Sequence, residues 1–156
     1  MRLDDLLVRR VYARHGWIPG MTIRFVARAA GVDEEPDYEY LSAGVSENAD
    51  GTGFVLILQC GLDEPDDQDV ALGMDSYCLI TADEGTAYGC VTEVALTDDL
   101  LRVVVRPDAL ELLGLDDTEI EATLDVDEDS IDRLRDGLRL VLNYGRPEAR
   151  PVIRLS

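Results

Sequence analysis

The sequence predicts an α+β fold: an antiparallel β meander, a short helix, and a C-terminal amphipathic helix packed on the sheet. Two observations lead to this prediction. Short runs of alternating apolar and polar residues, separated by turn-forming residues, fill residues 22–106 and return at 119–126. Apolar residues then recur at three- and four-residue spacing over 128–143, which is typical of a helix with one buried face. Strands followed by a late helix favour an antiparallel α+β domain.

Seven strands are expected, six of them before residue 107. The expected strands are, in order, residues 22–32, 38–47, 54–60, 76–81, 87–96, 100–106 and 119–126. An acidic loop with Pro36 follows the first strand, and Asn, Asp and Gly residues predict a turn at 48–53. A strongly acidic loop spans 63–69, and a short loop at 83–85 closes a hairpin.

Two helices are expected in the last third of the chain. Pro107 and Gly114 bracket a short helix over 107–113, because proline suits the first helical position and glycine the residue after the last. Asp127 is the expected N-cap of a helix from Glu128 to about Asn143. We therefore expect residues 21–156 to form a single domain, and residues 1–20 to be a leader or loosely attached segment.

The composition excludes several functions. The chain has 156 residues, of which 33 are acidic and 14 basic, all of them arginine, for a net charge of −19. Such a charge repels nucleic acid phosphates and anionic membrane surfaces, so neither is an expected partner. The longest apolar runs suit buried strands and are too short to span a membrane.

Catalytic and redox signatures are sparse. The one histidine is His15, there is no lysine, and there is no Gly-x-Ser-x-Gly or phosphate-binding glycine motif. We therefore expect no enzyme and no cofactor. Cys78 and Cys90 lie symmetrically about the 83–85 loop, which predicts that they face each other on neighbouring strands. They are then either a disulfide or, in a reducing cytosol, two packed thiols.

The acidic charge is concentrated in the middle of the chain. Residues 33–99 hold eighteen acidic residues and no arginine, and the densest run is 63–69. One interpretation is a solvated surface. The other is a patch that binds either a basic partner or a divalent cation, although no ligand spacing defines a metal site.

Several segments resemble a known family. They are Gln68–Leu79, Gly85–Val91, Ala109–Leu115 and Leu134–Leu138. In this order they resemble the tenth immunity-protein family of bacterial polymorphic toxin systems, over residues 22–155. The resemblance implies a cytoplasmic protein, expressed beside a secreted toxin, that neutralises the toxin by binding it.

The resemblance and the charge together predict partner-binding residues. Acidic residues steer a basic toxin domain, and aromatic residues slow its dissociation. The expected electrostatic contacts are Asp66, Asp67, Asp69 and Asp75, and the expected partly exposed anchors are Tyr77 and Tyr88. The alternative for Asp75 is a turn cap before a strand, and for both tyrosines it is core packing. The alternative function is a domain that binds a small ligand or divalent cation through the 63–69 loop.

Overall fold

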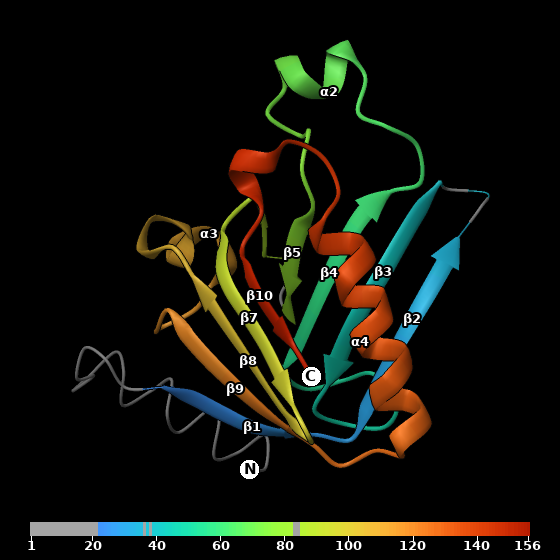
Figure 1. The fold of residues 1–156 in the computed structure, drawn as a ribbon. Helices are drawn as coiled ribbons and strands as arrows, with labels where there is room; N and C mark the ends of the chain where they lie inside the picture. The colour runs from blue at the N-terminus through green and yellow to red at the C-terminus, as the bar shows by residue number, and fades with distance from the viewer. Residues whose placement is uncertain (1–21, 36, 38, 83–84) are drawn as a thin grey trace.

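A computed structural model describes residues 22–35, 37, 39–82 and 85–156, and it confirms the α+β fold (Figure 1). The expectations for residues 1–20 lie outside the described residues. The strands form two five-stranded sheets. Sheet A has the order β1 (Ile23–Ala27), β9 (Glu119–Leu124), β8 (Leu100–Val105), β7 (Val91–Thr97) and β10 (Val152–Leu155). Sheet B has the order β2 (Ala29–Glu35), β3 (Tyr40–Ser46), β4 (Val55–Gly61), β5 (Cys78–Thr81) and β6 (Thr86–Tyr88).

Sheet B is the expected antiparallel meander, whereas sheet A is mixed. Neighbours in sheet B are also neighbours in the sequence. The centre of sheet A is antiparallel, but its two outer strands, β1 and β10, run parallel to β9 and β7. These long-range parallel pairings leave no local turn signal in the sequence, so they were not predicted.

The predicted strand over 22–32 is divided between the two sheets. The buried side chains of Ile23, Phe25 and Ala27 belong to sheet A, and the chain then crosses at the exposed Arg28 into β2 of sheet B. The prediction of one continuous strand was wrong because alternation alone does not report a change of sheet. Most of the predicted acidic loop also belongs to β2, an outermost strand whose carboxylates reach solvent.

The predicted strand over 87–96 divides in the same way. β6 ends at Tyr88, Gly89 takes a positive φ of 59°, and β7 begins two residues later in the other sheet. A residue with a side chain rarely adopts this backbone conformation, so the glycine permits the turn between sheets.

Both predicted helices are confirmed. A short 3-10 turn, η2 (Pro107–Ala109), leads into α3 (Leu110–Leu113), which ends at Gly114 with φ 65°. Helix α4 (Glu128–Leu142) begins at Asp127, whose side chain accepts a hydrogen bond from the Ser130 amide. Three short elements were not predicted: α2 (Asp67–Ala71), inside the expected acidic loop, η3 (Pro147–Ala149) and the strand β10.

One hydrophobic core joins the two sheets and α4. The inner faces of both sheets contribute to it, and the Phe25 and Phe54 rings meet between the sheets at 4.8 Å. Helix α4 buries Leu134, Leu138 and Val141 and packs on β2, β3 and β4, as predicted. It therefore covers the inner face of sheet B. The outer face of this sheet is covered by none of the described elements (Figure 1).

Candidate functional site

Residues 62–75, which we call the acidic protrusion, extend beyond the end of sheet B and contain α2 (Figure 1). The start of α2 is held by two reciprocal hydrogen bonds. The Asp66 side chain accepts from the Asp69 amide at 2.8 Å, and the Asp69 side chain accepts from the Asp66 amide at 3.0 Å. None of the five helical residues is buried, so local capping rather than core packing forms this helix.

Apart from Asp75, which is paired with Arg146, the carboxylates of the protrusion have no counterion among the described residues. Asp66 and Asp67 are exposed and Asp69 is half-buried. Among the described residues, no arginine forms an ion pair with these three or with Asp63 or Glu64. Their negative potential is therefore directed to solvent, where it can act on an approaching molecule.

A hollow of about 470 Å³ lies between the protrusion and the end of sheet B, and we call it the acidic hollow. It brings together carboxylates and phenol rings from segments that are far apart in the sequence. Its acidic lining residues are Glu39, Asp63, Glu64, Asp66 and Asp69, and its tyrosines are Tyr40, Tyr88 and Tyr144. Of the predicted residues, Asp66, Asp69 and Tyr88 thus line one surface.

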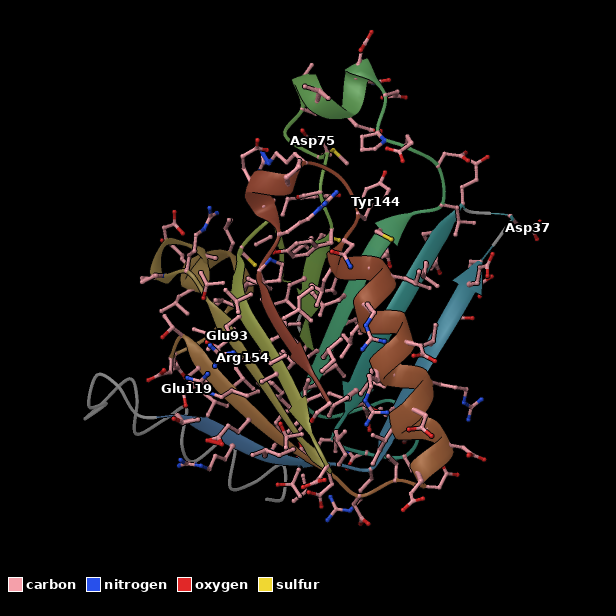
Figure 2. The ribbon with its side chains drawn as sticks, in the orientation of Figure 1. Asp37, Asp75, Glu93, Glu119, Tyr144 and Arg154 are labelled. Carbon is pink, nitrogen blue, oxygen red and sulfur yellow. The ribbon has the colours of Figure 1, made fainter. Side chains whose placement is uncertain are left out.

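Tyr144, which was not predicted, ties the protrusion to the end of α4. Its hydroxyl donates a hydrogen bond to the Asp63 carbonyl oxygen at 2.8 Å, and Figure 2 shows it below α2. Burial, together with nearby carboxylates such as Asp69, raises the pKa of Tyr144 to about 12. Burial likewise raises the pKa of the half-buried Tyr88. Both phenols therefore remain neutral at physiological pH.

Tyr77 lies in the core, so the expectation of partial exposure was wrong. Its side chain is completely buried. Its hydroxyl accepts a hydrogen bond from the Val91 amide at 3.0 Å and lies 2.9 Å from the Ala149 carbonyl oxygen. Burial raises the pKa of Tyr77. The ring joins β5 to β7 and to η3, which is the core-packing alternative.

Asp75 faces inward, toward the segment that follows α4. Its Oδ1 lies 3.6 Å from Arg146 Nη1, and its carbonyl oxygen accepts a hydrogen bond from the Arg146 amide at 2.9 Å. Gly145 lies so close that a Cβ there would be 2.1 Å from the Asp75 carbonyl oxygen. Asp75 therefore holds the base of the protrusion, and it does not line the acidic hollow.

Exposed apolar side chains on the protrusion were missed by the sequence analysis. Val70 and Leu72 are 58% and 63% exposed, and Leu62 and Met74 are each 39% exposed. The signal in the sequence was that these residues lie beside an acidic run, in a segment too short to bury a face. Exposed apolar residues rimmed by polar residues are typical of protein interaction sites.

The predicted pairing of Cys78 with Cys90 was wrong. Cys78 faces Tyr88 across the β5–β6 hairpin, and all three cysteines are free thiols. In the structure Thr81 pairs with Gly85, so the centre of the turn lies one residue earlier in the chain than predicted. Each residue of β5 therefore faces a partner two residues earlier in the sequence than the predicted one. Gly85 fits there because a Cβ would lie 2.8 Å from the Leu113 carbonyl oxygen.

The described residues contain neither a metal-binding cluster nor a membrane-spanning helix. Within the described residues, no cluster of three or more His, Cys, Asp or Glu side chains is placed to hold a metal ion. None of the helices there has the length and apolar content needed to cross a bilayer. The acidic protrusion and the acidic hollow together present carboxylates, tyrosines and exposed aliphatic residues. Such a surface complements a cationic partner with apolar side chains.

Comparison with known proteins identifies a family. The model of the family described as Immunity protein 10 matches residues 26–132, which is more than half of the chain. The match contains β2 to β9, the protrusion and the start of α4. No curated protein and no solved structure matches this chain.

Proposed function

This chain belongs to the immunity protein 10 family, and we propose that it is a non-enzymatic cytoplasmic protein that binds and neutralises a cognate toxin of a polymorphic toxin system. The acidic protrusion is the proposed first point of contact. The observation that carries this proposal is the group of carboxylates at Asp63, Glu64, Asp66, Asp67 and Asp69, which have no ion-pair partner among the described residues.

The proposed binding has two contributions. Unpaired carboxylates attract a basic toxin domain over several ångströms and raise the rate of association. Val70, Leu72 and Met74 on the protrusion, with Tyr88 in the hollow, then lose contact with water and slow dissociation. Asp75 and Tyr77 support this surface from behind, as positioning residues.

A triple substitution tests the steering. Replacing Asp66, Asp67 and Asp69 with Asn removes three negative charges and keeps the capping geometry, since asparagine is also a good N-cap. We expect association with the toxin domain encoded beside this gene to slow by about tenfold at low ionic strength, with little change in dissociation. Stopped-flow fluorescence or surface plasmon resonance measures both rates.

The matched control removes the same charge from the opposite end of the molecule. Asp98, Asp99 and Asp125 are exposed near the β7–β8 turn and the start of α4 (Figure 1). Their replacement with Asn should leave association nearly unchanged. Equal slowing in both variants would mean that net charge alone acts, and no slowing in either would contradict steering.

Co-expression tests the function itself. The neighbouring toxin is induced in a heterologous host with and without this chain, and rescue with co-purification of the two proteins is the expected result. A toxic neighbour that still kills, with no complex recovered, contradicts the proposed pairing. The alternative of a divalent-cation site predicts instead a thermal shift with calcium or magnesium that a chelator reverses.

A further inference from the structure

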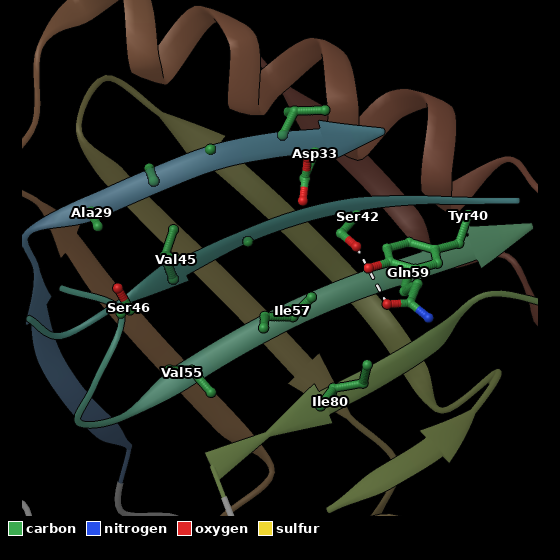
Figure 3. A pocket seen from close by; sticks show the side chains of 15 residues that line it. Ala29, Asp33, Tyr40, Ser42, Val45, Ser46, Val55, Ile57, Gln59 and Ile80 are labelled. Carbon is green, nitrogen blue, oxygen red and sulfur yellow. Dashed lines mark hydrogen bonds between the residues drawn. The ribbon is translucent and has the colours of Figure 1, made fainter. Parts of the chain in front are cut away.

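The outer faces of the two sheets differ in chemistry. On sheet A this face carries ion pairs between strands, from Arg24 to Glu121 and from Arg102 to Glu119. The Arg102 hydrogen bond lowers the pKa of Glu119, as expected for a solvated, ion-paired surface. The outer face of sheet B carries aliphatic side chains instead (Figure 3).

This face of sheet B is hollowed along one cross-strand row. Gly31 on β2 pairs with Gly44 on β3, Gly44 pairs with Ile57 on β4, and Ile57 pairs with Ile80 on β5. The two glycines leave a floor without side chains beside a wall of two half-buried isoleucines. The resulting groove has a volume of about 500 Å³, and we call it the outer groove.

The two glycines of the floor differ in the room around them. A Cβ on Gly44 would lie 2.6 Å from the Leu56 carbonyl oxygen, so the packing of β3 on β4 itself requires a glycine. At Gly31 a Cβ would meet no atom within 4 Å. Among the described residues the space above Gly31 is therefore open, and no packing contact there requires it to stay empty.

The outer groove continues into the acidic hollow. Tyr40 and Gln59 line both, and Ser42 donates a hydrogen bond to Gln59 at 3.3 Å in the row between them (Figure 3). Asp33 lies at this end of the groove. A single surface thus passes from aliphatic side chains to carboxylates, so its complement is an apolar group followed by a cation.

We propose that the outer groove is the second half of the toxin-binding surface. It receives a segment of the toxin that carries an aliphatic side chain over Gly31 and Gly44, with a neighbouring lysine or arginine directed to Asp33 and the acidic hollow. This inference rests on the proposed function. A second copy of this chain fits less well, because each copy carries a net charge of −19 and the acidic ends would repel.

The test fills the outer groove at Gly31, where a Cβ meets no atom within 4 Å. Gly31→Leu places a side chain in space that no described residue occupies. We expect the Kd of this variant for the toxin domain encoded beside this gene to rise at least about tenfold. The reason is that one methylene in an apolar pocket already changes binding by about 10- to 200-fold. The matched control is Thr123→Leu, an exposed position of β9 in sheet A, which should leave Kd unchanged.

The outcomes separate this inference from the function on which it rests. If the natural chain does not bind or rescue, the proposed function fails. If it binds and Gly31→Leu binds equally well, only the groove proposal fails. A chain that dimerises alone, and becomes monomeric with Gly31→Leu, would assign the groove to a second copy and overturn the proposal.

A second measurement on the natural chain covers the case in which Gly31→Leu does not fold. In methyl NMR spectra, the signals of Ile57 and Ile80 should shift or broaden when the toxin domain is added. The fully buried Ile120 of sheet A serves as the internal reference. Unchanged Ile57 and Ile80 signals in a formed complex would overturn the proposal.

Discussion

The three thiols illustrate how burial controls residue chemistry in this protein. All are buried and free, and burial raises the pKa of Cys60 and of Cys90 to about 11. The thiolate is the reactive form, so a raised pKa leaves little of it at neutral pH. Cys78 lies beside the acidic hollow, but it too is buried and its pKa is raised.

These thiols should therefore react slowly in the native state. At pH 8 we expect iodoacetamide to modify native Cys60 and Cys90 far more slowly than the same residues in urea, where an ordinary thiol has a pKa of about 8.5. The native rate should rise as pH approaches 11. Mass spectrometry of timed samples measures both rates, and fast native labelling at pH 8 would contradict the buried placement.

At the scale of elements, α4 lies close to sheet B because of one glycine. A Cβ on Gly137 would lie 2.4 Å from Val32 Cγ2 and 3.3 Å from Ala43 Cβ. The glycine lowers the intrinsic stability of the helix by about 1 kcal/mol relative to alanine. It also lets the helix backbone approach β2, whose position forms one border of the outer groove.

Gly137→Ala should accordingly destabilise the protein despite its better helix propensity. Overpacking typically costs about 1–3 kcal/mol, and the stiff Val32 side chain has few alternative rotamers, so we expect a net loss of about 1 kcal/mol. Adding Val32→Ala should recover part of this loss. Urea unfolding of the four proteins in this double-mutant cycle measures the coupling, and a more stable Gly137→Ala variant would contradict the close packing.

The elements that could be predicted from the sequence are those with local signals. Asp127 and the spacing of Leu134 and Leu138 specify α4, and turn residues separate most strands of sheet B. The crossing at Arg28 and the parallel strand β10 depend on partners distant in sequence, so no local pattern reports them.

The sequence predicted where the acidic residues of the site lie, but not how the side chains around them are arranged. The acidic run located the protrusion, and Asp66 and Asp69 do line the hollow. The prediction for Cys90 failed because β6 ends at Tyr88, where the chain leaves sheet B, so Cys90 has no partner on β5. The prediction for Tyr77 failed because the burial of its side chain depends on contacts with Val91 and Ala149, which are distant in the sequence. Tyr144 reaches the hollow only through tertiary packing.

The whole molecule is dominated by its negative charge. With a net charge of −19 on 156 residues, repulsion between like charges lowers the stability of the folded protein. The acidic residues of the protrusion concentrate this repulsion at one end of the molecule. Dissolved salt weakens such interactions over distances greater than the Debye length. The same charge that is proposed to attract a toxin therefore lowers the stability of the free protein.

Salt should consequently act with opposite sign on folding and on binding. Raising NaCl from about 0.01 M to about 1 M shortens the Debye length from about 30 Å to about 3 Å. We expect the melting temperature of the free chain to rise and the rate of association with the toxin to fall over this range. Differential scanning calorimetry and stopped-flow kinetics measure the two effects, and a melting temperature that falls would contradict self-repulsion.

The mixed topology of sheet A has a consequence for how the protein is made. Ile23 of β1 pairs with Ile120 of β9, which lies 97 residues later, whereas sheet B is contiguous from β2 to β6. At a translation rate of about 5–20 residues per second, β1 waits roughly 5 to 20 seconds on the ribosome for its partner. The strands of the outer groove can pair during that interval, although α4 emerges only later. A protein proposed to protect its own cell can thus complete sheet A only after β10 (Val152–Leu155) has been synthesised, although sheet B can form earlier.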